Sequence, residues 1–346
     1  MPVSIADVAQ CAGVSRTTVS HVLSGNRPVS EDVSNRVRAA MAELGYVPSR
    51  TARNLARGST QTIGLLLPDI SNSFFADLAK GVEAACIESG FNVLLCNTGW
   101  NREREVFYLE TLRSRAVDGV LYASGATPAA STLEELLAGL PVVAVDEALP
   151  GVAVTSVSSD NRQGGRTAAE HLLSLGHRRA AVIGVNRELA SSAERLDGFQ
   201  SQWEKVTSER ALVIEGSFDE ESGVRAAAAL IPAIREGEVT AIFATNDLNA
   251  LGAMTVLREA GIEVPAECSV IGFDDFIAAR HAFPPLTTIR QDATQMGTRA
   301  AHALLSQLSG EEARRHTVLA VELVVRSSTD RAPGPAANQG GHHADT

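Results

Sequence analysis

The first fifty residues carry apolar side chains at helical spacing and contain no run typical of a strand. In the first predicted helix the apolar residues recur at i, i+3, i+4 and i+7 and so share one face: Ile5, Val8, Ala9 and Ala12. Ser4 precedes this run with Asp7 three residues further on, which is the spacing of a capping box. We therefore expect a helix that begins after Ser4 and ends at Gly13.

Two more short helices are predicted after the first. The second has its apolar positions at Val14, Val19, Val22 and Leu23. The third opens after Ser30, stops at Gly45 and has its apolar positions at Val33, Val37, Met41 and Leu44. Three short helices with a tight glycine turn between the first two outline a helix-turn-helix head that is entirely α-helical.

From Thr62 the pattern changes to apolar runs that alternate with amphipathic helices. The predicted strands of this part are TIGLLLPD, NVLLCN and DGVLYA, and the same alternation restarts after Asp160 with AAVIGV, ALVIEG, TAIFATND and CSVIGFDD. Continuous runs of Val, Leu and Ile are typical of strands buried on both faces of a parallel sheet. The body is therefore predicted to be two similar α/β lobes, each a doubly wound parallel sheet. Residues 331–346 are small and polar and are predicted to be a disordered tail.

Charge separates the head from the body. The whole chain has a formal net charge of −11, whereas the first sixty residues hold seven arginines and four acids and carry +3, which leaves −14 for the rest. A basic head on an acidic body suggests that the head binds a polyanion and that the body has a different function.

Several function classes find no support in the sequence. No apolar run approaches the roughly 18 residues that span a bilayer and no signal peptide is visible, so we expect a cytoplasmic protein that has no membrane partner. The four cysteines lie far apart without a C-x-x-C pair, and no metal-spaced histidine cluster, phosphate loop or nucleophile motif occurs. We therefore expect no catalytic residues, no metal and no cofactor, and the missing signal peptide and helical head exclude a transport-type binding protein.

Motifs along the chain resemble the LacI/GalR family of bacterial transcription regulators. In the head these are A-x-x-A-G-V-S-x-x-T-V-S-x-V-L, G-Y-x-P and A-R-x-L-A, and in the body IGLLLPD, GHRRAAVIG, ERLDGF, ATNDLNALGAM, VIGFDD and LTTIRQD. The resemblance covers residues 3 to 330. It implies a periplasmic-binding-protein-like body and a regulator, more often a repressor than an activator, that binds a palindromic operator as a homodimer and responds to a small-molecule effector.

The resemblance also sets the expected domain limits. Residues 1–48 form the DNA-binding domain, 49–60 the hinge helix and linker, and 61–330 the effector-binding and dimerisation domain. Within this domain the first lobe takes about 61–159 and 289–318, and the second takes about 160–288 and 319–330.

Short polar or basic side chains near the start of the second helix fit the requirements of a recognition helix in the major groove. By resemblance Arg16, Thr17 and His21 occupy base-reading positions, although Arg16 could instead hold only phosphate. In the hinge, Leu55 corresponds to a leucine that wedges into the minor groove, with a plain linker helix as the alternative. The full set of candidate DNA-binding residues is Ser4, Arg16, Thr17, Thr18, Ser20, His21, Asn26, Arg50, Arg53 and Leu55.

Candidate effector-binding residues lie where loops follow the predicted strands, and they match ligand-contacting positions of the family. They are Phe74, Phe75, Asp146, Ser191, Arg195, Phe243, Asn246, Asp274 and Gln291. Aromatic walls, one guanidinium and several carboxylate or amide groups suit a carbohydrate. For Phe243, which lies inside the predicted strand AIFAT, core packing is the favoured role and a wall of the site the other. Asp275 is expected to be structural because neighbours on an extended chain point apart. A purine or another metabolite remains the alternative effector.

Overall fold

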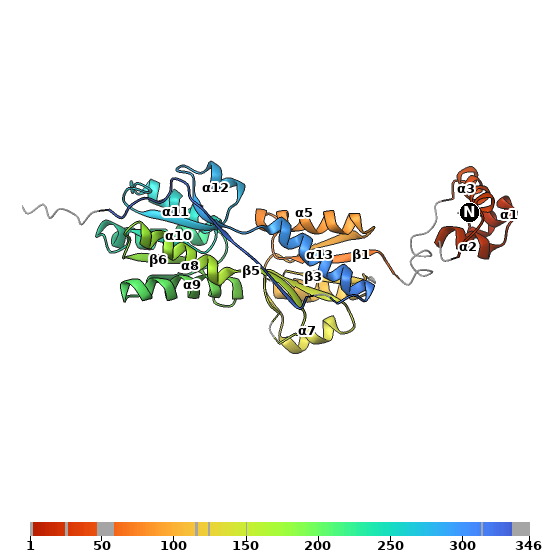
Figure 1. Ribbon diagram of the computed structural model, residues 1–346, viewed down its shortest axis with the longest axis horizontal. Coiled ribbons are helices and arrows are strands. Elements are labelled where there is room, and N and C mark those ends of the chain that lie inside the picture. Colours follow the sequence, from red (N-terminus) through yellow and green to blue (C-terminus); the bar gives the residue numbers. More distant parts are fainter. Residues whose placement is uncertain are drawn as a thin grey trace, which may run out of the picture.

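The computed structural model describes residues 3–24, 27–46, 59–114, 117–123, 125–149, 151–312 and 314–333. The head consists of α1 (Ile5–Ala12), α2 (Arg16–Ser24) and α3 (Glu31–Leu44) (Figure 1). The predicted capping box is present, because the Ser4 hydroxyl accepts from the Asp7 amide while the Asp7 carboxylate accepts from the Ser4 amide. Gly13 ends α1 in the left-handed region with φ 63°, which glycine adopts without steric cost.

A small core and one arginine hold the head helices together. The core contains Val8, Val19 and Val37, one from each helix, and all three side chains are fully buried. The Arg36 guanidinium of α3 donates to the carbonyl oxygens of Ala12 and Gly13 at 2.9 and 3.2 Å, and so satisfies the free end of α1. The turn between α1 and α2 is thereby fixed by α3.

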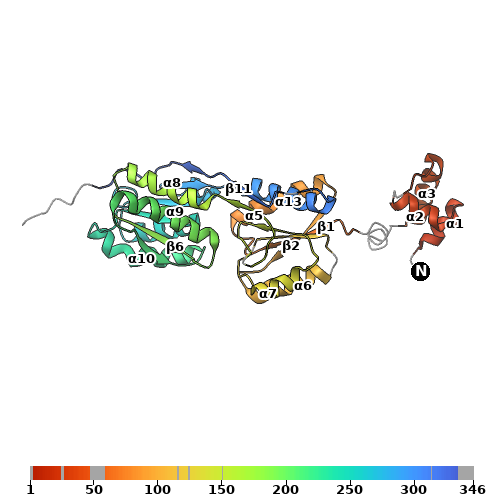
Figure 2. The same ribbon diagram turned by 60° about the horizontal axis from the view of Figure 1, so that its bottom comes forward.

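The first lobe is a six-stranded sheet with all its strands parallel, in the order β11-β5-β4-β3-β1-β2. Its strands are β1 (Thr62–Leu67), β2 (Asn92–Asn97), β3 (Gly119–Tyr122), β4 (Val142–Val145), β5 (Thr155–Ser159) and β11 (His316–Leu319). Helices α5 (Ser73–Glu88) and α13 (Ala293–Ser309) cover one face, and α6 (Arg102–Ser114) and α7 (Ala130–Leu137) cover the other (Figure 2). The apolar runs of the sequence are thus buried on both faces.

The second lobe repeats this plan, with the strand order β12-β10-β9-β8-β6-β7. Its strands are β6 (Ala180–Val185), β7 (Leu212–Glu215), β8 (Ala241–Ala244), β9 (Ser269–Asp274), β10 (Thr287–Arg290) and β12 (Glu322–Val324), of which only β12 is antiparallel to its neighbour. Its helices are α8 (Asn161–Ser174), α9 (Ala190–Thr207), α10 (Glu220–Arg235), α11 (Asp247–Glu259) and α12 (Ile277–His281). The predicted fold class of a helical head and two doubly wound lobes is confirmed.

The chain crosses between the lobes three times, after β5, after β10 and between β11 and β12 (Figure 1). At the second crossing the chain leaves the second sheet after Arg290, because Ile289 and Arg290 still pair with β9 and β12. At the third it leaves the first sheet after Leu319, which pairs with β5. Hydrophobic runs alone do not show which of two similar sheets a strand joins.

Glycine pairs allow two pairs of helices to pack backbone against backbone. A Cβ at Gly81 of α5 would lie 2.0 Å from the Thr294 carbonyl oxygen of α13, and one at Gly297 would meet the Leu78 oxygen at 2.1 Å. The second lobe repeats the arrangement, with Gly165 of α8 against the Arg195 carbonyl oxygen at 2.0 Å. Each lobe therefore contains a close helix pair that tolerates no side chain at these positions, and in the second lobe α10 and α11 form another through Gly223 and Gly252.

We predict that Gly165→Ala destabilises the second lobe by about 1–3 kcal/mol or more, because the added methyl group must push α9 away from α8. Urea unfolding followed by circular dichroism measures the loss. The exposed Arg166→Ala, on the same turn of α8, is the matched control and should change the free energy of unfolding by less than about 0.5 kcal/mol. Equal stability of the two variants would contradict the close packing.

Candidate functional site

The carboxyl ends of both sheets face a buried cavity that takes residues from both lobes. In doubly wound sheets with this strand order, ligands bind outside the carboxyl ends of the strands. The residues that line it are Asn72, Phe74, Phe75, Asp146, Arg195, Phe218, Asn246, Asp274 and Gln291. The structure thus brings together seven of the nine side chains that the sequence predicted. The volume of the cavity is about 20 Å³.

Arg195, in the first turns of α9, is the only cation that lines this cavity among the described residues. Its side chain is 2% exposed and lies over the Phe273 ring, with 3.8 Å between the guanidinium carbon and the ring centre. Nε donates to Asn161 Oδ1 at 2.9 Å and Nη1 donates to the Thr245 carbonyl oxygen at 2.7 Å. Arg195 is therefore held in one orientation by three contacts within the second lobe.

Asp274 ends β9 and faces Arg195, with 3.7 Å between Oδ1 and Nη1. Gln291 Nε2 donates to the same oxygen at 2.6 Å. The backbone of Asp274 has φ 116°, a conformation that non-glycine residues rarely adopt. Burial raises the pKa of Asp274 to about 7, although the Arg195 charge opposes the shift.

Asp146 and Glu147 follow β4 and bring two more carboxylates to the same region. Asp146 lines the cavity, and its Oδ1 is buried without a hydrogen-bond partner among the described residues. Burial raises the pKa of Asp146, and Arg195 again opposes the shift. Glu147 accepts from the Ser191 amide at 3.2 Å and from the Ser191 hydroxyl, which ties the first lobe to the start of α9 in the second.

Glu147 was not among the predicted residues, and neither were Phe218 and Asn72, which both line the cavity. Burial, reinforced by the neighbouring Asp146 charge, raises the pKa of Glu147 to about 7. Asn72 caps α5 by accepting from the Phe74 amide at 3.0 Å. Phe218 meets Trp100 of the first lobe edge to face, with 6.5 Å between ring centres. The position of Glu147 after a strand was a usable signal, whereas nothing in the loop sequence pointed to Phe218.

Two of the predicted effector residues do not line the cavity. Phe243 is fully buried in β8, where its ring stacks on Phe199 at 5.0 Å in the core of the second lobe. Its assignment to the effector site is corrected to core packing, because a strand inside a covered sheet turns both its faces to helices. Ser191 is also buried, and it binds Glu147 instead of facing the cavity.

Asp275 points away from the cavity and has a separate set of partners. It is 1% exposed in its side chain and forms ion pairs with Arg280, Arg290 and Arg326. The expectation that Asp274 and Asp275 point to different surroundings agrees with these contacts. Within the described part of the chain, no group of three or more His, Cys, Asp or Glu side chains could hold a metal ion.

The recognition-helix candidates lie on α2. Arg16 and Thr17 are exposed in its first turn, and Ser20 and His21 are half-buried further along. The Thr18 hydroxyl lies 2.8 Å from the Ser15 hydroxyl, and the Thr18 amide donates to Ser15 at 3.0 Å, so Ser15 caps α2.

Of the remaining DNA-binding candidates, one lies in the described part of the head. Ser4 caps α1. Asn26, Arg50, Arg53 and Leu55 lie outside the described residues, together with most of the expected hinge helix.

Comparison with known proteins identifies the family. Residues 4–49 match the model for bacterial regulatory proteins of the lacI family, and residues 169–329 match a periplasmic binding protein-like domain. DegA, an HTH-type transcriptional regulator of Bacillus subtilis (strain 168), is 38% identical over 335 residues, which are 95% of this chain and 98% of DegA. The chain belongs to the LacI family.

Other relatives of this LacI-family chain are also regulators. The HTH-type transcriptional repressor PurR of Vibrio atlanticus (strain LGP32) is 35% identical over 329 residues, which cover 94% of this chain and 98% of PurR. The structure of a transcriptional regulator CelR–cellobiose complex is 34% identical with a TM-score of 0.70, and covers 94% of this chain and 99% of that one. The lac repressor dimer bound to operator and the anti-inducer ONPF is 29% identical with a TM-score of 0.83, over 95% and 100% of the two chains.

The LacI-family chain is therefore a helix-turn-helix transcriptional regulator and not an enzyme. A helix long and apolar enough to cross a membrane is not found among its described residues.

The raised pKa of Glu147 makes the stability of this LacI-family regulator dependent on pH. The folded state holds the proton of Glu147 more tightly than the unfolded chain, so stability is lost as pH rises from about 4.5 to about 7. Glu147→Gln removes this loss. We expect the variant to gain on the order of 1–3 kcal/mol over the natural chain at pH 8 and little at pH 5, because one pKa unit corresponds to about 1.4 kcal/mol.

Thermal unfolding at both pH values measures this difference. Glu188→Gln, at an exposed position of the loop before α9, is the control and should follow the natural chain at each pH. If Glu147→Gln shifted the melting temperature equally at pH 5 and pH 8, the buried carboxylate would not be the cause.

Proposed function

We propose that this regulator is a repressor that binds a palindromic operator as a homodimer and is controlled by a carbohydrate in the cavity between its lobes. The observation that carries the effector class is a pair of buried acceptors. Asp146 and Gln291 both line the cavity. The Oδ1 atom of Asp146 and the Oε1 atom of Gln291 are buried without a hydrogen-bond partner among the described residues. Buried acceptors without partners are costly, so a ligand that donates hydrogen bonds to both is favoured.

The charges around the cavity support a ligand without negative charge. Asp146, Asp274 and the nearby Glu147 face one guanidinium, and burial already raises the pKa of all three carboxyls. An added phosphate or carboxylate would face these groups without a second cation, whereas hydroxyl groups can donate to them. Phe75 and Phe218 supply aromatic faces for the apolar side of a sugar ring. CelR, a relative by structure, is described in complex with cellobiose.

A purine is the second candidate effector. Its ring N–H groups can donate to the two unpartnered acceptors, as hydroxyl groups can, but a purine offers fewer donors than a sugar with several hydroxyl groups. The sequence of PurR repressors is similar over almost the whole chain, so this class belongs in the same screen.

Contacts between the lobes offer a route from the effector to the DNA. Glu147 and Ser191 join the lobes on one side of the cavity, and Trp100 and Phe218 meet on another. A ligand that separates or tightens these pairs changes the angle between the lobes of each subunit. A coupling free energy of about 1–3 kcal/mol changes DNA affinity roughly 5- to 150-fold, which is enough for control.

A thermal-shift screen of the full-length protein tests the effector class. We expect stabilisation by neutral sugars and none by the corresponding sugar phosphates, with about 2.7 kcal/mol gained at 100 times the dissociation constant. Stabilisation by purines alone would replace the carbohydrate by the second candidate. Stabilisation by sugar phosphates in preference to sugars would contradict the charge argument.

Substitutions in the cavity test its role in the response. Arg195→Ala and Asp274→Ala should abolish the effect of the sugar on operator affinity and leave operator binding itself intact. Arg187→Ala is the control, because Arg187 is exposed and pairs with the exposed Glu215 at 3.0 Å outside the cavity. A response that survives both cavity substitutions would place the effector elsewhere.

Arg16 tests the recognition helix. Its exposed position in the first turn of α2 allows a bidentate contact with a guanine, so Arg16→Ala should weaken operator binding by about 1–3 kcal/mol and relax the preference at one base pair. Fluorescence anisotropy with operator variants and with random DNA measures both effects. An equal loss on operator and random DNA would show that Arg16 contacts only phosphate.

A further inference from the structure

Strand β11 forms an edge of the first sheet, and among the described residues no further strand pairs with its outer side. It lies beside α13 (Figure 2). The carbonyl oxygens of Arg315 and Leu319 accept from amides on the β5 side at 2.9 and 2.8 Å. Because successive residues of a strand turn their backbone groups to opposite sides, the N–H and C=O groups of His316 and Val318 face outward. An edge of this kind can pair with a strand from another chain.

A hollow of about 490 Å³ lies beside β11 on the face of the sheet that α13 covers, and we call it the basic hollow. Helix α13 packs mainly on β3, β4 and β5, so the hollow lies between this helix and the edge strand. Two residues of β11 line it, together with Arg299 and His302 of α13 and Arg314 before the strand. All three basic side chains are exposed, and Glu312 is the only acidic residue in the described lining.

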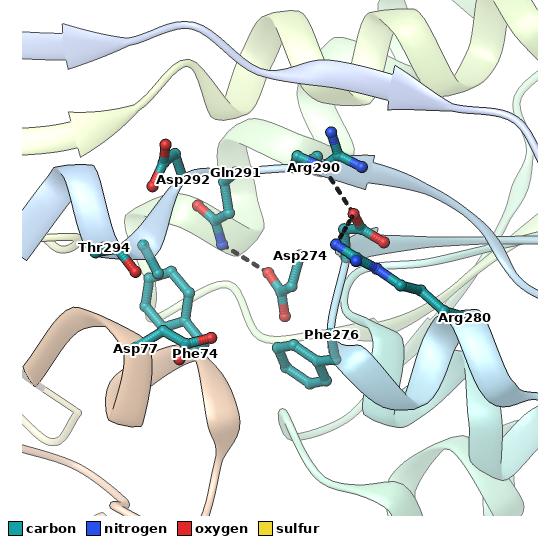
Figure 3. Close-up of a pocket in the computed structure, with 11 residues that line it drawn as sticks. Phe74, Asp77, Asp274, Phe276, Arg280, Arg290, Gln291, Asp292 and Thr294 are labelled. Atoms are coloured by element: carbon teal, nitrogen blue, oxygen red, sulfur yellow. Dashed lines mark hydrogen bonds and ion pairs between the residues drawn. The ribbon is translucent and has the colours of Figure 1, made fainter. Parts of the chain in front are cut away.

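The arginines of the basic hollow differ from others on the same body in having no acidic partner. In the second lobe, Arg280 and Arg290 lie against Asp275 at 3.5 and 2.7 Å (Figure 3). No ion pair joins Arg299 or Arg314 to an acid within the described part of the chain. Their guanidinium groups are therefore available to carboxylates of a partner, which arginine binds in a bidentate manner.

The opposite face of the sheet has a smaller hollow of about 170 Å³ beside the same strand, and we call it the apolar hollow. His316 of β11 lines it, and its Nδ1 lies 2.9 Å from the Ser156 hydroxyl of β5. Most of the lining is apolar and includes Leu149, Val152 and Val154, which precede β5. A strand that pairs with β11 thus meets the basic hollow on one face and the apolar hollow on the other.

The chemistry of the two hollows selects the occupant of this edge. Side chains of a strand alternate between its faces, so acidic side chains on one face and small apolar side chains on the other complement both hollows. A second copy of the edge supplies no acid, because residues 314–320 read RRHTVLA. A nucleic acid would pair with the arginines but would leave the apolar hollow and the outward backbone groups without partners.

We propose that β11 and these two hollows form a docking site for an extended acidic segment of another protein, which adds to the first sheet as a further strand. Main-chain hydrogen bonds to His316 and Val318 then give affinity, and the alternation of acidic and apolar side chains gives specificity. The proposal does not depend on the identity of the effector.

Fluorescence anisotropy with labelled peptides and the full-length protein tests this site. The probes are peptides of roughly ten residues in which Glu or Asp alternates with one apolar type, Ala, Val or Leu. Each has a shuffled partner of the same composition. At least one alternating peptide should bind about ten-fold or more tightly than its shuffled form.

N-methylation of the peptide tests the pairing without any change to the protein. One form carries N-methyl groups on its acidic residues and the other on its apolar residues. Only one of the two forms should lose the advantage over the shuffled peptide, because every second N–H of a paired strand faces β11.

Substitutions test the same contact from the side of the protein. Val318→Pro removes an outward N–H and keeps the pairing with β5, so it should lower the affinity for the alternating peptide to that for the shuffled one. Val318→Thr keeps the N–H and is the matched control. Arg299→Glu combined with Arg314→Glu should weaken binding about ten-fold or more, whereas Arg258→Glu, exposed on α11, should not.

Equal affinities for alternating and shuffled peptides overturn the strand addition and leave only attraction between charges. Tight binding of both N-methylated forms overturns it as well. Binding of no peptide overturns the proposed partner. If Val318→Pro then lowers the oligomeric state in analytical ultracentrifugation, the edge belongs to a second copy of the chain instead.

Discussion

The buried guanidinium of Arg195 holds the other groups of the cavity in place through its hydrogen bonds and its ion pair. Its own backbone oxygen packs against Gly165, so its place is set by the closest helix contact of the second lobe. Its side chain then binds Asn161 at the start of α8, the Thr245 carbonyl after β8 and Asp274 after β9. One side chain thereby joins two strand ends and two helices at a single point. Because a buried cation needs compensating groups on several sides, these elements cannot shift independently of it.

One cation does not balance the acids around it. Asp247, fully buried behind Asp274, accepts from the Thr288 hydroxyl at 2.7 Å and from the Phe276 amide at 2.9 Å, and burial raises its pKa well above the ordinary value. With Asp146 and Asp274 this gives a site rich in carboxyl groups, two of which are held by hydrogen bonds while Asp146 keeps an unpartnered oxygen. Burying carboxyl groups without enough partners costs free energy in the ligand-free chain, and a ligand whose hydroxyl groups donate to them would lower this free-energy cost. The proposed preference for a neutral polyhydroxylated effector rests on the same imbalance.

Sequence reasoning predicted most of the fold and most of the cavity for one physical reason. Parallel strands place all their carboxyl ends at one edge of a sheet, so Asn246 and Asp274 of the second sheet had to come together once the strands were recognised, whereas Asp146 of the first sheet was placed with them by the family resemblance. It favoured core packing for Phe243 but still kept this residue among the effector candidates, since a strand covered on both faces shows no alternation that separates a core position from an exposed one. It also missed Glu147 and Phe218, because their roles depend on contacts with the opposite lobe. The hydrophobic pattern of one lobe does not predict how that lobe packs against the other.

The position of the crossings within the two sheets determines how such lobes can move. All three crossings leave from the β5–β11 edge of the first sheet and the β10–β12 edge of the second. Trp100 follows β2 and Phe218 follows β7, which are the strands at the opposite edges of both sheets. A rotation about the crossings therefore separates this aromatic pair most and the crossings least. An aromatic pair contributes about 0.5–1.5 kcal/mol, which is comparable with the coupling that regulation requires, so the closed arrangement is stable enough to form and weak enough for a ligand to change.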